Sequence, residues 1–157
     1  MTPVFKLLPD AVTTAAATSK QDVLATLAEL MANAYGLDET SVLEGLEERE
    51  HLGSTGFGRG VAIPHARLDG LNIPVAALVR LDSPVDFKAA DGMLVGLVVG
   101  LLSPSNAGVT HLHALAAISR MVRDEAINEL LAEAGDSEAL FALLTNVLAG
   151  GVDRDAA

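Results

Sequence analysis

The spacing of hydrophobic residues changes several times along the chain, and each change predicts a new element. Between Ser19 and Gly36 apolar side chains recur every three or four residues, which is the period of one helix face. Ser19 is a typical helix N-cap, and Gly36 is a typical helix end. A second helix is expected from Thr40 or Ser41 to Gly53, with its leucines facing the core and its glutamates facing solvent. The pattern therefore predicts two amphipathic helices in this part of the chain.

Three segments that follow have the composition of strands. They are residues 61–64, 75–81 and 93–102, and an earlier β-favouring stretch, residues 4–17, is broken by Pro9. The segment 93–102 (MLVGLVVGLL) is apolar on both faces, so we expect it in the middle of a sheet with helices on both sides. It has about half the length that a helix needs to cross a bilayer, so no membrane insertion is expected.

After residue 106 the pattern becomes helical again. The segments THLHALAAISRMV, DEAINELLAEA and DSEALFALLTNVLA predict three helices, the last of them capped by Asp136. No repeat or low-complexity linker divides the chain, so we expect one domain, residues 1–150, and a disordered tail, residues 151–157. The order of elements predicts a single three-layer α/β domain, in which helices flank a mixed β-sheet.

Composition narrows the range of functions. The chain has 157 residues, enough for one ordinary core, and a formal net charge of -11. That charge argues against binding to nucleic acid or anionic membranes and favours partners with a basic patch. The chain has no cysteine, which excludes disulfides, thiolate zinc sites and cysteine nucleophiles. Because no secretion signal is visible either, we expect a cytoplasmic protein.

The clearest chemistry lies in residues 53–67, GSTGFGRGVAIPHAR. This stretch has more glycine than a simple turn needs, so we expect its backbone to approach a ligand closely, and a phosphate is the natural candidate. Pro64 should end the strand and place His65 at an edge or end of the sheet. A neutral imidazole, with an ordinary pKa of about 6.5, is available as a nucleophile at neutral pH. Candidate donors to a phosphoryl group on this ring are the N–H groups of the turn, including Gly56, the Ser54 and Thr55 hydroxyls, and Arg49, Arg59 and Arg67.

The polar residues fit other kinds of site less well. On a helix, His111 and His113 of THLHAL point about 200° apart, so they cannot chelate a metal from one face, and no metal site is expected. The glycine-rich turn lacks the Gly-Lys-Ser/Thr of a nucleotide-binding loop, and Ser54 is not in a G-x-S-x-G elbow. Arg49, in EERE, is equally compatible with a solvated helix end.

Two strings together carry a resemblance to a known family. REHLGSTGFGRGVAIPHAR and, after an apolar strand and a Pro-Ser-Asn turn, THLHAL closely resemble the enzyme IIA domain of the fructose/mannitol class (type 2) of the bacterial phosphotransferase system. The stand-alone nitrogen-regulatory members are the most similar, and the resemblance covers residues 5–148. It implies the mannitol-type IIA fold and the following roles: phosphorylation of His65 by a small carrier protein of the HPr type, His111 as the second active-site histidine, and Arg49 as a charge partner.

The resemblance implies two alternative functions for such a phosphotransferase-type phosphocarrier. In the first, its phosphorylation state decides which target proteins it binds, as in relatives that act on potassium transport and sensor kinases. In the second, it passes the phosphoryl group to a IIB domain for sugar uptake. A chain without a fused IIB segment favours the first function. A member that only binds proteins is disfavoured because His65, His111 and Arg49 are all present. None of these functions requires a cofactor.

Overall fold

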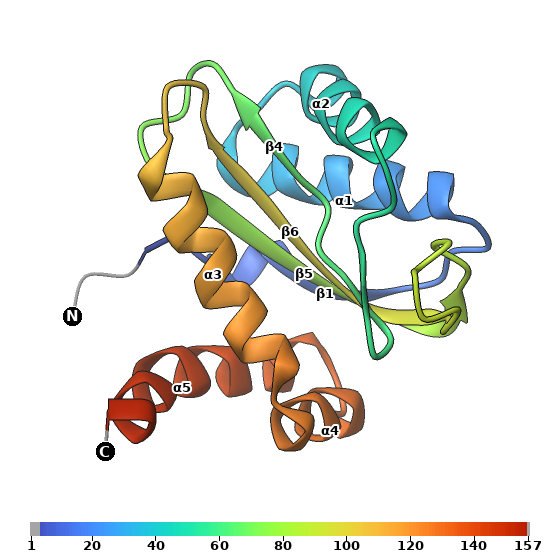
Figure 1. Ribbon diagram of the computed structural model, residues 1–157, viewed down its shortest axis with the longest axis vertical. Coiled ribbons are helices and arrows are strands. Elements are labelled where there is room, and N and C mark those ends of the chain that lie inside the picture. The colour runs from blue at the N-terminus through green and yellow to red at the C-terminus, as the bar shows by residue number, and fades with distance from the viewer. Residues whose placement is uncertain (1–3, 157) are drawn as a thin grey trace.

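A computed structural model describes residues 4–156, with side chains up to residue 148. These residues form one six-stranded sheet and five α-helices (Figure 1). The strands are β1 (Val12–Ala15), β2 (Gly56–Gly58), β3 (Val61–Ala62), β4 (His65–Leu68), β5 (Val75–Val85) and β6 (Val95–Pro104). A short 3-10 helix, η1 (Pro9–Ala11), precedes β1, and the α-helices are α1 (Lys20–Tyr35), α2 (Glu39–His51), α3 (Val109–Arg123), α4 (Glu125–Glu133) and α5 (Ser137–Ala156).

The sheet is mixed, as the sequence predicts. Its main order is β1-β5-β6-β3-β2, and β4 also pairs with β6. Strands β1 and β5 are parallel, β5 and β6 are antiparallel, and β3 and β4 both run parallel to β6. The apolar segment predicted to lie in the middle of the sheet is β6, which is displaced by two residues from the predicted range and ends at Pro104.

Helices cover both faces of the sheet and make three layers (Figure 1). One core cluster packs α1 and α2 against the sheet residues Ala62, Ala77, Val79, Val98 and Leu102. The other packs α3, α4 and α5 against Val61, Leu78, Leu97, Val99 and Leu101. Because successive strand residues point to opposite faces, the all-apolar β6 supplies both clusters. The predicted three-layer α/β domain is confirmed.

The predicted limits of the helices are confirmed for α1 and corrected for α2. The Ser19 side chain accepts a hydrogen bond from the Asp22 N–H, and Gly36 ends the helix at a φ of 67°. Helix α2, however, is capped by Asp38 rather than by Thr40 or Ser41, because the Asp38 carboxylate accepts from both the N–H and the hydroxyl of Ser41. A carboxylate accepts two bonds at once, which makes it the stronger cap here. Helix α2 also ends earlier than the predicted Gly53, at His51 with Leu52 as its C-cap.

The strand expected to end before His65 instead resumes there. Strand β3 ends at Ala62 and β4 begins at His65, yet both pair with β6 in one register, Ala62 opposite Val98 and His65 opposite Leu101. Pro64 lacks an N–H, so it interrupts the ladder without changing the course of the chain. Since β4 pairs only with β6, His65 lies on an edge strand, as predicted.

The last helix begins as predicted and extends further than predicted. The Asp136 carboxylate accepts from the Ala139 N–H at 2.9 Å, which confirms the cap. The helical backbone continues to Ala156, past Gly150 and Gly151, where the sequence indicated an end. That residues 151–157 form a disordered tail stays a prediction.

Candidate active site

Four polar side chains from three elements meet at the edge strand β4. His65 and Arg67 alternate with Ala66 and therefore point to the same face of the sheet, the face that α3 covers. Helix α3 contributes His111, whose ring centroid lies 5.7 Å from that of His65. Arg49 comes from the last turn of α2, on the other side of the sheet, and reaches His65 at the open edge. The fold thus brings together His65, His111, Arg49 and Arg67, residues that the sequence analysis singled out.

The hydrogen bonds of His65 define its tautomer. Its Nδ1 lies 2.7 Å from the Ile63 carbonyl oxygen, which can only accept, so Nδ1 carries the hydrogen. Its Nε2 then has the lone pair, and it accepts from Nε of Arg49 at 3.3 Å. Arg49 is held in turn by Nη1, which donates to the Gly53 carbonyl at 2.9 Å. The nucleophilic nitrogen therefore faces a cationic donor.

The surroundings of His65 keep its ring neutral. Burial is the largest cause that lowers its pKa, and the nearby charges of Arg49 and Arg67 lower it further. The hydrogen bond to Ile63 and the charge of Glu50 act in the opposite direction without reversing the shift. At neutral pH Nε2 therefore keeps its lone pair, which an electrophile can reach once the Arg49 N–H moves away.

His111 is a buried, neutral neighbour. Only 6% of the residue is exposed, and its Nδ1 lies 2.6 Å from the Ser103 hydroxyl. Burial, followed by the charges of Arg67 and His65, lowers its pKa to about 4. His113, two residues further on the helix, is exposed. The expectation that at most one of these two rings faces the site is confirmed.

These residues line a pocket of about 590 Å³. Its polar lining consists of the two histidines, the two arginines and Glu48, and apolar side chains surround them at the surface. Of these, Leu52 is 84% exposed and Leu112 is 60% exposed. Such a pocket offers a neutral imidazole, cationic donors and an apolar rim, which suit the holding of a phosphoryl group while another protein docks.

The glycine-rich turn lies close to other protein atoms. A Cβ on Gly56 would lie 2.8 Å from the Cβ of Ala89, so the close approach inferred from the glycines is made to the loop before β6. The Ser54 hydroxyl donates to the Phe87 carbonyl and accepts from the Gly56 N–H, and the Thr55 hydroxyl donates to Glu50. Ser54, Thr55 and Gly56 thus use these groups in bonds to other protein atoms, and a phosphate contact from them stays a prediction.

Glu50 is a residue that the sequence analysis misjudged. It was expected to be solvated, yet its side chain is only 6% exposed. Its carboxylate pairs with Lys20 at 2.8 Å and accepts from the Thr55 N–H at 2.9 Å. Nothing in EERE distinguishes it from neighbouring glutamates, because its burial depends on how the following turn folds back onto the helix. Glu50 fixes the start of that turn beside Arg49.

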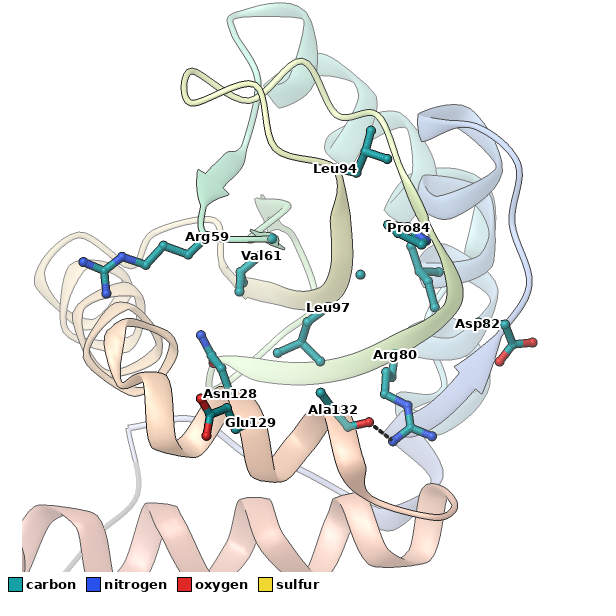
Figure 2. Close-up of a pocket in the computed structure, with 13 residues that line it drawn as sticks. Arg59, Val61, Arg80, Asp82, Pro84, Leu94, Leu97, Asn128, Glu129 and Ala132 are labelled. Carbon is teal, nitrogen blue, oxygen red and sulfur yellow. Dashed lines mark hydrogen bonds between the residues drawn. The ribbon is translucent and has the colours of Figure 1, made fainter.

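A second pocket, of about 650 Å³, lies between β3, β5, β6 and α4 (Figure 2). The side chain of Arg59, a candidate phosphate donor from the sequence, is drawn at this pocket and donates to the Arg123 carbonyl at the end of α3. Arg80 donates to the Leu131 carbonyl at 3.0 Å and so caps α4. Arg59 is therefore removed from the histidine site, and no histidine lines this second pocket.

No metal site and no membrane span emerge from the part of the chain that the structure describes. Within it, no three His, Asp or Glu side chains come close enough to hold a metal ion together. None of its helices combines the length and the apolar composition needed to cross a bilayer.

Comparisons with known proteins agree with this geometry. Residues 7–147 match the model of a family described as "Phosphoenolpyruvate-dependent sugar phosphotransferase system, EIIA 2". A nitrogen regulatory protein of Bradyrhizobium diazoefficiens is 44% identical over 126 residues, which cover 80% of this chain and 82% of that protein. The crystal structure of nitrogen regulatory protein IIA-Ntr from Neisseria meningitidis has a TM-score of 0.81 at 35% identity, covering 88% of this chain and 95% of that one.

A more distant structure shares the fold alone. It is the complex of enzyme IIA-mannitol and phosphorylated enzyme IIB-mannitol from Escherichia coli. The chain matched there has a TM-score of 0.73 at 20% identity, with 93% of this chain and 99% of that chain covered.

Proposed function

The chain belongs to the type 2 EIIA family of the phosphoenolpyruvate-dependent phosphotransferase system, and we propose that its phosphoryl acceptor is Nε2 of His65. Proteins of this family exchange phosphoryl groups with other proteins of that system. Similarity to nitrogen regulatory proteins over four fifths of the chain places it in the nitrogen-regulatory branch as a phosphohistidine carrier. The observation that carries the proposal is the hydrogen bond from Arg49 to Nε2 of His65.

The phosphoryl group comes from the phosphohistidine of an HPr-type carrier. The N–H of Arg49 first moves off the lone pair on Nε2. That lone pair then forms the new phosphorus–nitrogen bond while the bond to the carrier's ring breaks, and that ring recovers its own lone pair. The hydrogen on Nδ1 of His65 stays in place, so the phosphorylated ring is cationic. The Ile63 carbonyl, 2.7 Å from Nδ1, favours that positive charge.

The basic side chains stabilise the group during transfer. In a loose transition state the negative charge is spread over three phosphoryl oxygens, so positioned donors contribute more than a strong base. Arg49 already contacts the acceptor nitrogen, and Arg67 lies close enough to lower the pKa of both histidines. His111 supplies a neutral donor from the other side of the pocket.

Phosphorylation changes what the pocket offers to a partner. A phosphoryl group brings about two negative charges into a basic depression with an apolar rim. Target proteins that prefer one form are then selected by the phosphorylation state, and potassium transport proteins or sensor kinases are the proposed targets. We retain onward transfer to a IIB domain as the alternative, because the IIA-mannitol of the complex described above is bound to such a partner. A cytoplasmic location is part of the same proposal.

The test is intact-mass spectrometry at neutral to mildly alkaline pH, after the protein is mixed with a phosphorylated HPr-type carrier. We expect one acid-labile phosphoryl group on the wild type and none on His65→Ala. The matched control is His113→Ala, which removes an exposed histidine outside the pocket and should be phosphorylated like the wild type.

Two results would contradict the proposal. Normal phosphorylation of a folded His65→Ala variant would place the acceptor elsewhere. No phosphorylation of the wild type, by a carrier shown to phosphorylate another IIA protein, would mean that the chain binds partners without carrying the group.

A further inference from the structure

We propose that Ser103 sets the tautomer of His111, so that His111 presents Nε2–H to the phosphoryl pocket. This inference rests on the proposed function, because it assigns a positioning residue to the same site. Ser103 has no place in the motifs that indicate the family, and it lies on β6, outside the residues that line the pocket.

The placement of Ser103 is fixed by the sheet. It is the register partner of Arg67 on β4, so it points to the face that carries His65 and Arg67 and that α3 covers. The residue is completely buried, with an exposure of 0%, and its hydroxyl lies 2.6 Å from Nδ1 of His111. Both partners of this hydrogen bond are therefore shielded from water, which would otherwise replace either of them.

Burial decides the direction of the hydrogen bond. A hydroxyl has one hydrogen to donate, and a buried hydrogen without an acceptor is costly. Among the residues that the structure describes, the only hydrogen-bond partner of the Ser103 hydroxyl is Nδ1 of His111. If Nδ1 carried the hydrogen instead, the hydroxyl hydrogen would have no acceptor. Ser103 therefore donates, Nδ1 accepts, and the hydrogen of the neutral ring lies on Nε2.

The two histidines then have opposite tautomers that suit opposite roles. His65 keeps its hydrogen on Nδ1, because the Ile63 carbonyl accepts it, and exposes a lone pair on Nε2. His111 keeps its hydrogen on Nε2 and can donate to a phosphoryl oxygen on His65, whose ring centroid is 5.7 Å away. With its pKa lowered to about 4, His111 donates as a neutral ring and does not repel the cationic phosphohistidine. A serine outside the pocket thereby selects a donor within it.

The first test measures the tautomer in the unphosphorylated protein. Nitrogen-15 chemical shifts and long-range proton–nitrogen couplings distinguish a protonated ring nitrogen from an unprotonated one. We expect His111 of the wild type to show a hydrogen on Nε2 only, and Ser103→Ala to populate the Nδ1–H form as well. Ser103→Thr, which restores a hydroxyl, should return the wild-type signature. Hydrogen on Nδ1 in the wild type, or an unchanged tautomer in Ser103→Ala, would overturn the inference.

The second test is a double-mutant cycle on the rate of phosphoryl transfer from the carrier. We expect Ser103→Ala to slow transfer by about tenfold, the effect of losing one neutral hydrogen bond. The same change in a His111→Ala background should have no further effect, because Ser103 acts only through that ring. An equal slowing in both backgrounds would show a merely structural role. Thermal unfolding of each variant identifies any loss of fold.

The tests separate this inference from the proposed function. The tautomer is measured without any phosphoryl group, so it can contradict the role of Ser103 while His65 is still phosphorylated. Conversely, if the wild type shows the expected tautomer but accepts no phosphoryl group, the hydrogen bond from Ser103 is correct and the proposed function is wrong.

Discussion

Arg49 has two hydrogen-bond partners, and one of them is the nitrogen that we propose as the phosphoryl acceptor. One nitrogen donates to His65 and another to the Gly53 carbonyl at the start of the turn. We expect the bond to the Gly53 carbonyl to hold the guanidinium in place during transfer, so that little side-chain freedom is lost at that step. A lysine at the same position would keep the charge and lose this fixed geometry.

We expect Arg49→Ala to slow phosphoryl acceptance by about 10²- to 10³-fold, which is typical for the loss of one positioned donor to a developing charge. Arg49→Lys should give an intermediate rate. The rate is measured by mass spectrometry of rapidly quenched mixtures with the phosphorylated carrier. Arg120→Ala, at an exposed position on α3, is the control and should accept the phosphoryl group at the wild-type rate. An Arg49→Ala variant as fast as the wild type would remove Arg49 from the mechanism.

The lowered pKa of His111 makes stability depend on pH. Its pKa is about 6.5 in the unfolded chain and about 4 in the folded protein, so between these values the unfolded state binds more protons. The stability that His111 contributes by staying neutral is therefore fully present above pH 6.5 and is lost as the pH falls toward 4. The limit of this contribution is about 3 kcal/mol, since each unit of pKa corresponds to about 1.4 kcal/mol.

Urea unfolding at pH 7 and pH 4.5 tests this dependence. His111→Gln should lose less stability between the two values than the wild type does. His113→Gln, at an exposed position, should behave like the wild type. Carboxylates that titrate in the same range affect all three proteins alike. Equal losses in all three proteins would mean that His111 is not a buried neutral group.

At the scale of elements, the sequence predicted those features that depend on the local pattern of residues. The cap of α1, the strand β6 and the helical period of α3 follow from residues a few positions apart. The burial of Glu50 and the contacts of Ser54 and Thr55 do not, because they depend on how the turn after α2 folds back, onto that helix for Thr55 and onto the loop before β6 for Ser54. The bond of Ser103 to His111 was equally beyond prediction, since it joins a strand to a helix.

The close packing of α1 on β6 depends on one glycine. A Cβ on Gly100 would lie 2.8 Å from a methyl carbon of Leu27, which is completely buried, whereas a Cβ on Gly96 would meet nothing within 4 Å. The two glycines lie four residues apart on β6 and so face the same layer. We expect Gly100→Ala to lower the free energy of unfolding by about 1–3 kcal/mol through overpacking.

Gly96→Ala is the matched control for this prediction. It should leave stability unchanged or raise it slightly, because alanine reduces the freedom of the unfolded chain. Chemical denaturation of both variants makes the comparison. If both changes had the same effect, strand propensity rather than the contact with Leu27 would explain it.

At the scale of the whole molecule, the pocket lies at the edge of the sheet, where side chains from both helical layers meet at β4. Helix α2 belongs to the layer on one face of the sheet and α3 to the layer on the other, and only the edge strand β4 separates Arg49 from His111. Figure 1 shows the two helices on either side of this strand. This meeting of side chains from both layers follows from the three-dimensional fold.

A phosphoryl group on His65 would therefore act as a bridge between the layers, with Arg49 and His111 bound to the same three oxygens. We expect the amides of β4 to exchange hydrogen more slowly in the phosphorylated protein, because opening the edge would break contacts on both sides. Hydrogen exchange followed by mass spectrometry at mildly alkaline pH measures this. Phosphorylated His111→Ala should show less protection, and equal exchange with and without phosphate would refute the bridge. Partner proteins would then distinguish the phosphorylated form by the greater rigidity of this sheet edge as well as by the charge of the phosphoryl group.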